Sequence, residues 1–291
     1  MEDFYARFTL EKQYLNNVSP TTVASYRWAW KAFENSLKGK HPSALTKETI
    51  IARIAELRSR NLSAVTINTY LRSLNTFFRW LHAEGHSPTL LVIPKLREQQ
   101  KVLETFDDTQ IKRMIHFTPK SRAERRIHLL TCLLLDTGAR IDEALSINRI
   151  DDVDLDNLLL KIHGKGRKDR VVPFSLNLRK SLFRLMASSK PAYGDLLFFS
   201  GQGQKLNQRN ALRAFKGMCK RLRITGVRCS FHTLRHTFAT KYLRNGGDVL
   251  RLQRILGHEN LEMTRRYVNL QTADLQAVHH RFSPLAAGSR K

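Results

Sequence analysis

The chain has 291 residues, of which 42% are hydrophobic and 26% charged, as in a folded globular protein. No apolar run reaches the roughly 20 residues that a membrane-spanning helix needs, and the N-terminus lacks the pattern of a signal peptide, so we expect a cytoplasmic protein. The 50 Lys and Arg side chains against 25 Asp and Glu give a net charge of +25, which predicts a polyanionic partner, above all nucleic acid, with an anionic membrane surface as the alternative.

Length and cysteine content also limit the architecture. A chain of this size exceeds what one ordinary hydrophobic core holds, so we predict two domains. The three cysteines, Cys132, Cys219 and Cys229, show no C-x-x-C spacing, which argues against a disulfide framework and against a structural zinc site. We therefore expect reduced thiols and no metal ion or cofactor.

The first hundred residues have the pattern of a helical domain. Apolar residues spaced by three and four predict helices over residues 19–37, 45–60 and 63–85, and the aromatic residues among them are interpreted as core. The opposite faces carry basic side chains that could contact nucleic-acid phosphates, although a charged outer face can also simply be solvated. These side chains are Arg27, Lys31, Arg72 and Arg79.

A stretch with little periodicity separates the two halves of the chain. Residues 87–103 contain two prolines and are predicted to be a linker. The N-terminal domain then spans residues 1–86 and the C-terminal domain residues 104–291. Residues 1–100 hold 14 of the 50 basic and 8 of the 25 acidic side chains, so the second domain is the more basic one.

The second domain begins and ends with helical patterns and changes period in between. Helices are predicted over residues 107–117, 123–138 and 139–147, and again from Leu176 onward apart from a short apolar stretch at 196–199. Three short strands are predicted at residues 151–156, 158–164 and 169–174. We therefore expect a mainly α fold of two domains, the second of which contains one small antiparallel β-sheet.

Two motifs of the second domain place a basic side chain where it could hold an anion. In TGARIDEAL, Arg140 follows a helix break in an apolar neighbourhood, and Glu143 either neutralises it or orients it toward another anion. In HGKGRKDR, Lys165 lies between two glycines at the predicted tip of a β-hairpin. That position suits a mobile contact with a phosphate or a leaving group, but it is also common for a solvated turn lysine.

The motif FHTLRHTFAT brings histidines and an arginine together. His232, Arg235 and His236 share one helical face, because they are three and four residues apart. The glutamate of a two-histidine zinc helix is missing, and a neighbouring arginine disfavours a metal ion. A phosphate is therefore the better ligand for this face.

The motif ILGHENLEMTRRYVNL contains a predicted helix end at Gly257, then His258, and Tyr267 nine residues later. Taken alone, Tyr267 has the place of a core ring, because Met263, Tyr267 and Leu270 form a helical stripe. Its interpretation depends on the other motifs.

Together these side chains fit the cleavage of a phosphodiester. Attack on phosphorus places charge on the non-bridging oxygens, which Arg140 and Arg235 could stabilise without a metal ion. A tyrosine hydroxyl, with an ordinary pKa of about 10, needs a base such as His232 and nearby positive charge before it attacks. Lys165 could give the leaving sugar oxygen its proton.

These four motifs, in this order and approximate spacing, resemble the catalytic domain of the tyrosine recombinase (phage integrase) family. The first domain resembles the helical, SAM-like core-binding domain of that family, so the resemblance covers nearly the whole chain. It is similar to Xer-like or mobile-element recombinases, because we expect no additional arm-binding domain before the helical one. Asp142 stands where many members have Ser or Gly, which affects only the packing expected around Arg140.

The resemblance implies a role for each residue of the motifs. Arg140 and Arg235 correspond to the phosphate clamp, Glu143 to the support of Arg140, Tyr267 to the nucleophile, and Lys165 to the general acid, with Lys168 as a second candidate. His232 corresponds to the histidine of the His-x-x-Arg pair, His258 to the residue that contacts the scissile phosphate, and His236 to a structural position. Arg265 and Arg266 are expected to contact the DNA backbone or to be solvated.

The resemblance also implies a mechanism and partners. Each strand is cut to a 3′-phosphotyrosine with a free 5′-hydroxyl, and strands are exchanged through a Holliday junction without metal or ATP. The expected partners are double-stranded DNA with a specific recombination site and further protomers, two per site and four per synapse, with room for an accessory factor or a second recombinase. The amphipathic stretch at residues 272–282 is expected to dock on the next protomer or to pack on its own domain.

Two rival functions remain at this point. A relaxing topoisomerase or a telomere resolvase would use the same phosphotyrosine chemistry with another outcome, and the short chain favours the recombinase. A non-catalytic structural or regulatory DNA-binding protein would carry a decayed site, whereas every member of the expected set is present here.

Overall fold

A computed structural model describes residues 1–98, 103–164, 168–188 and 195–268. The chain divides into two compact units, Met1–Lys101 and Val102–Lys291. Within the described residues no helix is long and apolar enough to cross a membrane.

The first unit is built from helices that begin at side-chain caps. Ser19, Thr46 and Ser63 each accept a hydrogen bond from the backbone N–H three residues later, which satisfies a donor that the first helical turn leaves unpaired. The elements are α1 (Glu2–Tyr14), α2 (Pro20–Leu37), a short 3-10 helix (Pro42–Ala44), α3 (Lys47–Ser59) and α4 (Ala64–Ala83).

Aromatic rings fill the core of this unit, as the sequence predicts. Phe8, Phe33 and Phe77 are fully buried, and Phe8 lies 5.3 Å from Phe77 between ring centroids. Helix α1, which the spacing analysis does not single out, contributes Tyr5 and Phe8 to this cluster. The basic side chains predicted on the outer faces of α2 and α4 are all exposed: Arg27, Lys31, Arg72 and Arg79.

The stretch expected as a linker is attached to α4 where the structure describes it. Asn75 exchanges two hydrogen bonds of 2.9 Å with the backbone of Ile93, and Asn68 does the same with Leu96 at 2.8 and 2.9 Å. Ile93 is buried against the helical core. Residues 87–98 therefore have no helix or strand but are held by side-chain amides, while 99–102 lie outside the described residues, and the exact domain boundaries stay a prediction.

The second unit is mainly helical and contains one small antiparallel sheet, as expected. The strands lie in the order β1-β2-β3, and β2 pairs with β3 so that Leu160 faces Val172 and Lys161 faces Val171. The strands are β1 (Val153–Asp154), β2 (Leu159–Ile162) and β3 (Arg170–Pro173). The helices are α5 (Asp108–Ile115), α6 (Arg122–Thr137), α7 (Ile141–Ala144), α8 (Leu176–Ser188), α9 (Gln208–Arg221), α10 (Phe231–Arg244), α11 (Val249–Leu256) and α12 (Leu261–Val268).

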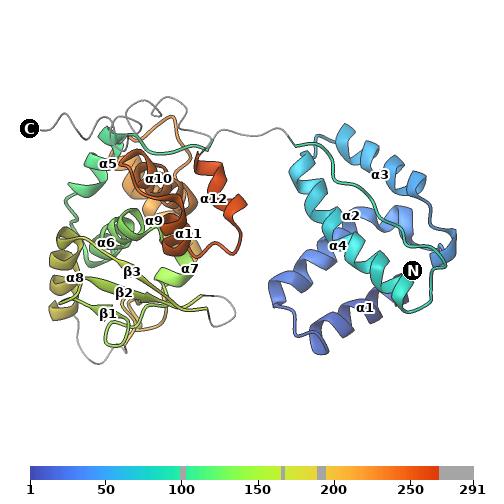
Figure 1. Cartoon of the computed structure of the whole chain (residues 1–291), viewed down its shortest axis with the longest axis horizontal. Helices are drawn as coiled ribbons and strands as arrows, with labels where there is room; N and C mark the ends of the chain where they lie inside the picture. Colours follow the sequence, from blue (N-terminus) through green and yellow to red (C-terminus); the bar gives the residue numbers. More distant parts are fainter. Residues whose placement is uncertain (99–102, 165–167, 189–194, 269–291) are drawn as a thin grey trace, which may run out of the picture. The chain divides into compact units, whose positions relative to one another are not determined.

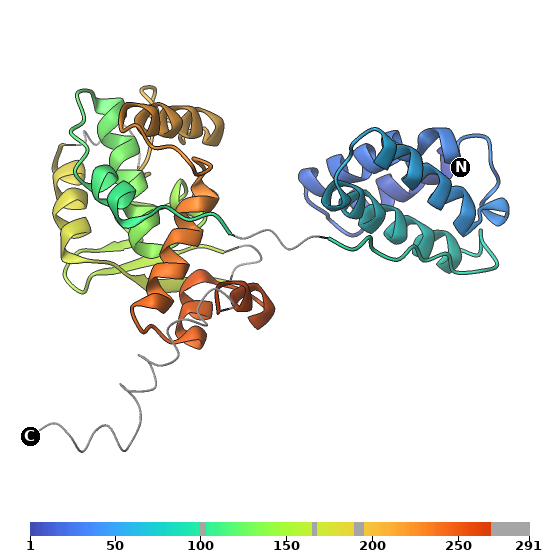
Figure 2. The ribbon, with the colours of Figure 1, turned by 90° about the horizontal axis from the view of Figure 1, so that it is seen from above.

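Helix α6 occupies the centre of this unit. It packs against α5, α8, α9 and α10, and its side chains share one core with Leu160, Ile162 and Val172 of the sheet. In Figure 1 the sheet lies at the lower edge of the unit, with α8 beside the strands and α5, α6, α9 and α10 above them. Figure 2 shows the yellow helix α8 at one end of the strands and the orange to red C-terminal helices at the other.

Two helices end at glycines whose backbone has a left-handed conformation. Gly138 after α6 and Gly257 after α11 both have φ of 64°, which side-chain-bearing residues adopt only with strain. A Cβ at Gly138 would lie 2.3 Å from Phe238, and a Cβ at Gly257 would lie 2.9 Å from a guanidinium nitrogen of Arg170. The chain therefore needs glycine here to bring two helix C-termini close to α10 and β3.

Candidate active site

Arg235 lies where the C-termini of α6 and α11 meet α10. Its side chain is 6% exposed, and its two terminal nitrogens donate hydrogen bonds of 2.7 Å to the carbonyl oxygens of Gly138 and Leu256. These carbonyls carry only the partial negative charge of a helix end. Burial, together with the positive charge of Arg140, lowers the pKa of Arg235 to about 10. A buried cation held by partial charges is a favourable place for an anion.

Arg140 lies beside the same helix end. Its Nη2 reaches the carbonyl oxygen of Gly257 at 3.4 Å, next to the carbonyl that Arg235 uses, and 44% of its side chain is exposed. Arg140 is the N-cap of α7, so the Glu143 carboxylate accepts both its backbone N–H at 2.8 Å and its Nη1 at 3.0 Å. Two guanidinium groups thus converge near Gly257, one buried and one reaching solvent.

Arg170 belongs to this network although the sequence analysis missed it. Its guanidinium donates to both oxygens of Glu143, at 3.1 and 2.7 Å, and its Nε donates to the Ile255 carbonyl at 2.8 Å. Burial raises the pKa of Glu143, but the hydrogen bonds from Arg170 and from the Arg140 backbone outweigh burial and leave that pKa below its ordinary value. Strand alternation could have revealed Arg170, because it shares the buried face of β3 with Val172 and a buried arginine needs a partner.

Tyr267 is at once a core ring and a neighbour of two histidines. Its side chain is 3% exposed and packs with Leu252 and Leu256 of α11. Its ring stacks on His258 with a centroid distance of 6.4 Å and an angle of 7°. Its hydroxyl lies 2.8 Å from Nδ1 of His236.

The helical stripe expected around Tyr267 is only partly buried. Met263 is 41% exposed, so the expectation that it continues the stripe is wrong, and Leu270 lies outside the described residues. Thr264 supplies the buried position instead, and its hydroxyl lies 2.9 Å from Nδ1 of His258. Helix α12 therefore buries two hydroxyl-bearing side chains. The Thr264 hydroxyl contacts His258, and the Tyr267 hydroxyl contacts His236.

The two histidines of α10 have different environments. His232 is exposed in the first turn of the helix, whereas His236 is half-buried and contacts Tyr267. The sequence interpretation gave His236 a structural role and His232 the part of the base. In the structure the tyrosine hydroxyl contacts His236.

The remaining candidates lie outside this cluster or outside the described residues. Lys165, which the sequence predicts at a hairpin tip, lies outside the described residues. Lys168 is exposed and forms an ion pair of 3.0 Å with Glu259, the residue that follows His258. Arg265 is exposed, and the side chain of Arg266 is not described.

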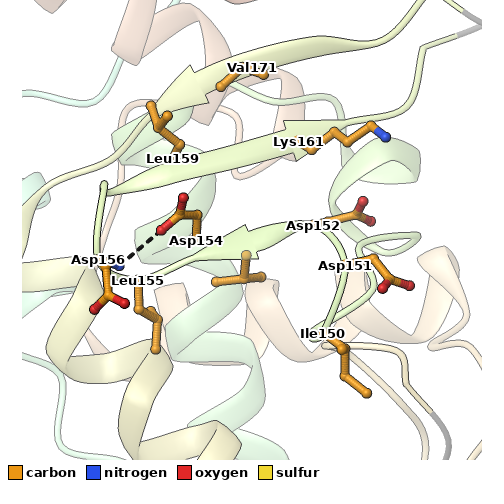
Figure 3. A pocket seen from close by; sticks show the side chains of 10 residues that line it. Ile150, Asp151, Asp152, Asp154, Leu155, Asp156, Leu159, Lys161 and Val171 are labelled. Atoms are coloured by element: carbon orange, nitrogen blue, oxygen red, sulfur yellow. Dashed lines mark hydrogen bonds between the residues drawn. The ribbon is translucent and has the colours of Figure 1, made fainter.

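A separate cavity of about 550 Å³ opens beside the sheet, away from the motif residues (Figure 3). Asp154, in the lining of this cavity, accepts a hydrogen bond of 3.1 Å from the backbone N–H of Asp156. Although four aspartates line the cavity, the described parts of the chain contain no group of three His, Cys, Asp or Glu side chains that could hold a metal ion. The cavity is lined by Ile150, Asp151, Asp152, Val153, Asp154, Leu155, Asp156, Leu159, Lys161 and Val171.

Family models match both parts of the chain. Residues 104–274 match the phage integrase family, and residues 4–85 match the N-terminal SAM-like domain of phage integrases. Among curated proteins, the chain is 30% identical to the tyrosine recombinase XerC of Bacillus subtilis, over 98% of each chain. It is 27% identical to the tyrosine recombinase XerD of Listeria monocytogenes, over 98% of this chain and 99% of the relative.

Solved structures with the same fold include two integrases. A lambda integrase (75-356) dimer bound to a COC′ core site superimposes with a TM-score of 0.75 at 18% identity, covering 94% of this chain and 96% of that one. The Tn1549 transposon integrase in complex with a circular intermediate DNA gives a TM-score of 0.75 at 19% identity, covering 91% and 93%. The chain therefore belongs to the phage integrase family of tyrosine recombinases, enzymes that cut and rejoin DNA strands.

Proposed function

We propose that this protein is a site-specific DNA recombinase that cuts and rejoins strands through a covalent phosphotyrosine on Tyr267. The observation that carries the proposal is the buried Arg235 guanidinium, which is held by helix-end carbonyls and lies within electrostatic reach of Arg140 and Tyr267. A phosphodiester at this place would supply the full negative charge that the carbonyls lack. The same contact would bring its phosphorus to the tyrosine.

The two arginines act as the phosphate clamp in this proposal. Attack on phosphorus spreads negative charge over the non-bridging oxygens, and donors fixed in advance stabilise that charge without reorganising. Arg235 is fixed by two short hydrogen bonds, and Arg140 is fixed by Glu143, which Arg170 shares. Arg140 keeps exposed surface through which it can meet the DNA.

The proposed chemical step begins at Tyr267. The Tyr267 oxygen bonds to phosphorus, the bond to the 5′ oxygen breaks, and the leaving oxygen takes a proton from Lys165, with Lys168 as the second candidate. His258, which stacks on Tyr267, contacts the scissile phosphate, and the exposed His232 remains the base predicted from the sequence. The 5′-hydroxyl of a partner duplex then reverses the reaction through a Holliday junction, and the phosphotyrosine preserves the bond energy, so neither ATP nor a metal ion is needed.

The partner in this proposal is double-stranded DNA that carries a recombination site. The net charge of +25 favours phosphate binding, and the exposed basic side chains of α2 and α4 are candidate backbone contacts. Among structures with this fold, XerH is bound to a difH substrate and a lambda integrase dimer is bound to a core site. By analogy we propose two protomers per site and four per synapse, with an accessory factor or second recombinase as a further partner.

A covalent-trapping experiment tests the proposal. The preferred site is first selected from a random duplex library with the purified protein, and a nicked version of that site is then incubated with protein in EDTA. Wild type is expected to form a protein–DNA adduct, Tyr267→Phe none, and the matched control Tyr242→Phe a normal amount. An adduct that persists in Tyr267→Phe, or that requires Mg²⁺, would contradict the proposal, and relaxation of supercoiled DNA without site preference would favour a topoisomerase.

A further inference from the structure

We propose that Arg170, the first residue of β3, is a positioning residue that holds Arg140 in place and keeps its charge available to the scissile phosphate. It acts through the carboxylate of Glu143 and through the C-terminal end of α11. The inference rests on the proposed function, in which Arg140 stabilises the charge that develops on the phosphate during cleavage.

The contacts of Arg170 engage its side chain within the protein. The side chain is 11% exposed, and it donates to both oxygens of Glu143, at 3.1 and 2.7 Å, and to the Ile255 carbonyl at 2.8 Å. A guanidinium that binds a carboxylate through two hydrogen bonds fixes the orientation of that carboxylate as well as its position. Arg170 is therefore placed to support the site rather than to bind the phosphate itself.

The Glu143 carboxylate joins Arg170 to Arg140. Its Oε1 accepts from Nη1 of both arginines, at 3.1 and 3.0 Å, and its Oε2 accepts from Arg170 Nη2 at 2.7 Å and from the Arg140 backbone N–H at 2.8 Å. Each oxygen thus receives one hydrogen bond from each arginine. Because the terminal torsion of a glutamate is broad, the carboxylate could turn without Arg170, and Arg140 would lose a fixed partner.

Arg170 also changes the charge that a phosphate would meet. Burial raises the pKa of Glu143, but the hydrogen bonds from the two arginines leave that pKa below its ordinary value, so the carboxylate is ionised at neutral pH. Arg140 and Glu143 alone would cancel, whereas together with Arg170 they carry one net positive charge. This charge reaches the clamp, because burial, then Arg140 and Arg170, lower the pKa of Arg235 to about 10.

The C-terminal end of α11 holds all three guanidinium groups, each on one of three consecutive carbonyl oxygens. The pairs are Arg170 with Ile255 at 2.8 Å, Arg235 with Leu256 at 2.7 Å and Arg140 with Gly257 at 3.4 Å. The last carbonyls of a helix have no partner within it and carry partial negative charge, so they can accept such donors. One helix end therefore sets the spacing of the clamp, and Arg170 ties that end to β3, on which α11 packs.

Single-turnover cleavage of the nicked site at saturating DNA tests the inference. Arg170→Met removes the charge and the hydrogen bonds but keeps a long side chain, and Arg170→Lys keeps the charge without the paired hydrogen bonds. Both are made in wild type and in Glu143→Gln. The matched control is Arg53→Met, because Arg53 is also buried, donates to a carbonyl and pairs with a carboxylate. DNA affinity and circular dichroism are measured for every variant.

We expect Arg170→Met to cleave about 10²-fold and Arg170→Lys about 10-fold more slowly than wild type, with DNA affinity little changed, because Arg140 is no longer held in place. Either substitution should cost much less in the Glu143→Gln protein, since residues that act through one contact are not additive. Arg53→Met should cleave at the wild-type rate. Arg170→Lys, which retains charge and most of the side-chain volume, decides the question should the methionine protein not fold.

A second substrate separates the clamp from the leaving group. Sulfur in place of the 5′ bridging oxygen leaves as a thiolate, and because a thiol has an ordinary pKa of about 8.5, it needs no proton from a general acid. We expect this substrate to leave the Arg170 variants as slow as before, relative to wild type. Recovery on the sulfur substrate would assign Arg170 to the leaving group instead.

Two further outcomes would overturn the inference. One is a wild-type cleavage rate in a folded Arg170 variant, and the other is an equal loss of rate with and without Glu143. Failure of the proposed function is distinguishable from both, because it would appear as an adduct in Tyr267→Phe.

Discussion

Two buried arginines, one in each unit, are compensated in different ways. Arg53 of the first unit is 7% exposed, donates to the Ala32 carbonyl at 2.8 Å and pairs with the carboxylate of Glu56. Arg235 of the second unit is 6% exposed, but its terminal nitrogens donate to backbone carbonyls, and its pKa is lowered. The two side chains are equally buried, but a carboxylate neutralises the charge of Arg53, whereas only backbone carbonyls accept hydrogen bonds from the terminal nitrogens of Arg235. The difference teaches that Arg53 serves the fold, whereas Arg235 is prepared for an anion from outside.

The largest expected difference is between the alanine variants of the two arginines. We expect Arg235→Ala to slow single-turnover cleavage by roughly 10³-fold, because a fixed donor to the developing charge is lost, while overall DNA affinity changes little. Arg53→Ala should instead lower the midpoint of urea unfolding and leave the cleavage rate of the folded protein unchanged. Equal losses of cleavage in the two variants, with folding intact, would show that the two arginines do not differ in role.

Glu143 offers a sharper version of the comparison, since its carboxylate accepts hydrogen bonds from Arg140 and Arg170, whereas Arg235 donates to backbone carbonyls. We expect Glu143→Gln to slow cleavage by about 10- to 100-fold by loosening Arg140, a smaller loss than that of Arg235→Ala. The pKa of Glu143 is lowered in the folded state, so its stabilisation is present above its unfolded pKa of about 4.3 and is lost as pH falls through the folded value. The free energy of unfolding, measured with urea from pH 3 to 7, should fall toward low pH in wild type and not in Glu143→Gln. If it falls equally in both proteins, the ion pairs of Glu143 with Arg140 and Arg170 do not contribute to stability.

The sequence could predict much of this arrangement, but not which groups compensate the charge of each arginine. Periodicity and caps predict most of the helices and the small sheet, and the order of the motifs predicts that Arg140, Arg235 and Tyr267 meet. Motifs carry no information on which carbonyl or imidazole a side chain reaches, so the contact of His236 with Tyr267 could not be assigned. Arg170 was missed for a related reason, because its partner Glu143 lies 27 residues away in the sequence.

The helix end that receives Arg235 can be perturbed without changing any charge. Gly257→Ala is expected to lower the free energy of unfolding by about 1 kcal/mol, because alanine is strained at a φ of 64° and its Cβ would press on Arg170. Cleavage should slow as well, since the neighbouring Leu256 carbonyl holds Arg235. Gly39→Ala, also at a positive φ of 75° but with open space around its Cβ, is the matched control and should lose stability while keeping the cleavage rate.

The smallest expected effect concerns His163, whose imidazole lies between two carboxylates. Its two nitrogens lie 2.8 Å from Asp152 and 2.9 Å from Asp169, and the hydrogen bond to Asp152 raises its pKa despite some desolvation. Its stabilisation is therefore fully present below the unfolded pKa of about 6.5 and is lost as pH rises through the folded pKa. We expect His163→Asn to lower stability at pH 5.5 more than at pH 8.5, with Asp169→Asn intermediate. A deficit that is the same at both pH values would contradict this.

The most direct measurement for the central claim is mass spectrometry of the protein–DNA adduct after digestion with protease and nuclease. The account predicts one peptide from α12 that carries a nucleotide on Tyr267 through a phosphotyrosine bond, and no such peptide from Arg235→Ala under the same conditions. A nucleotide attached to any other residue, or an equal yield of the Tyr267 adduct without Arg235, would contradict the account.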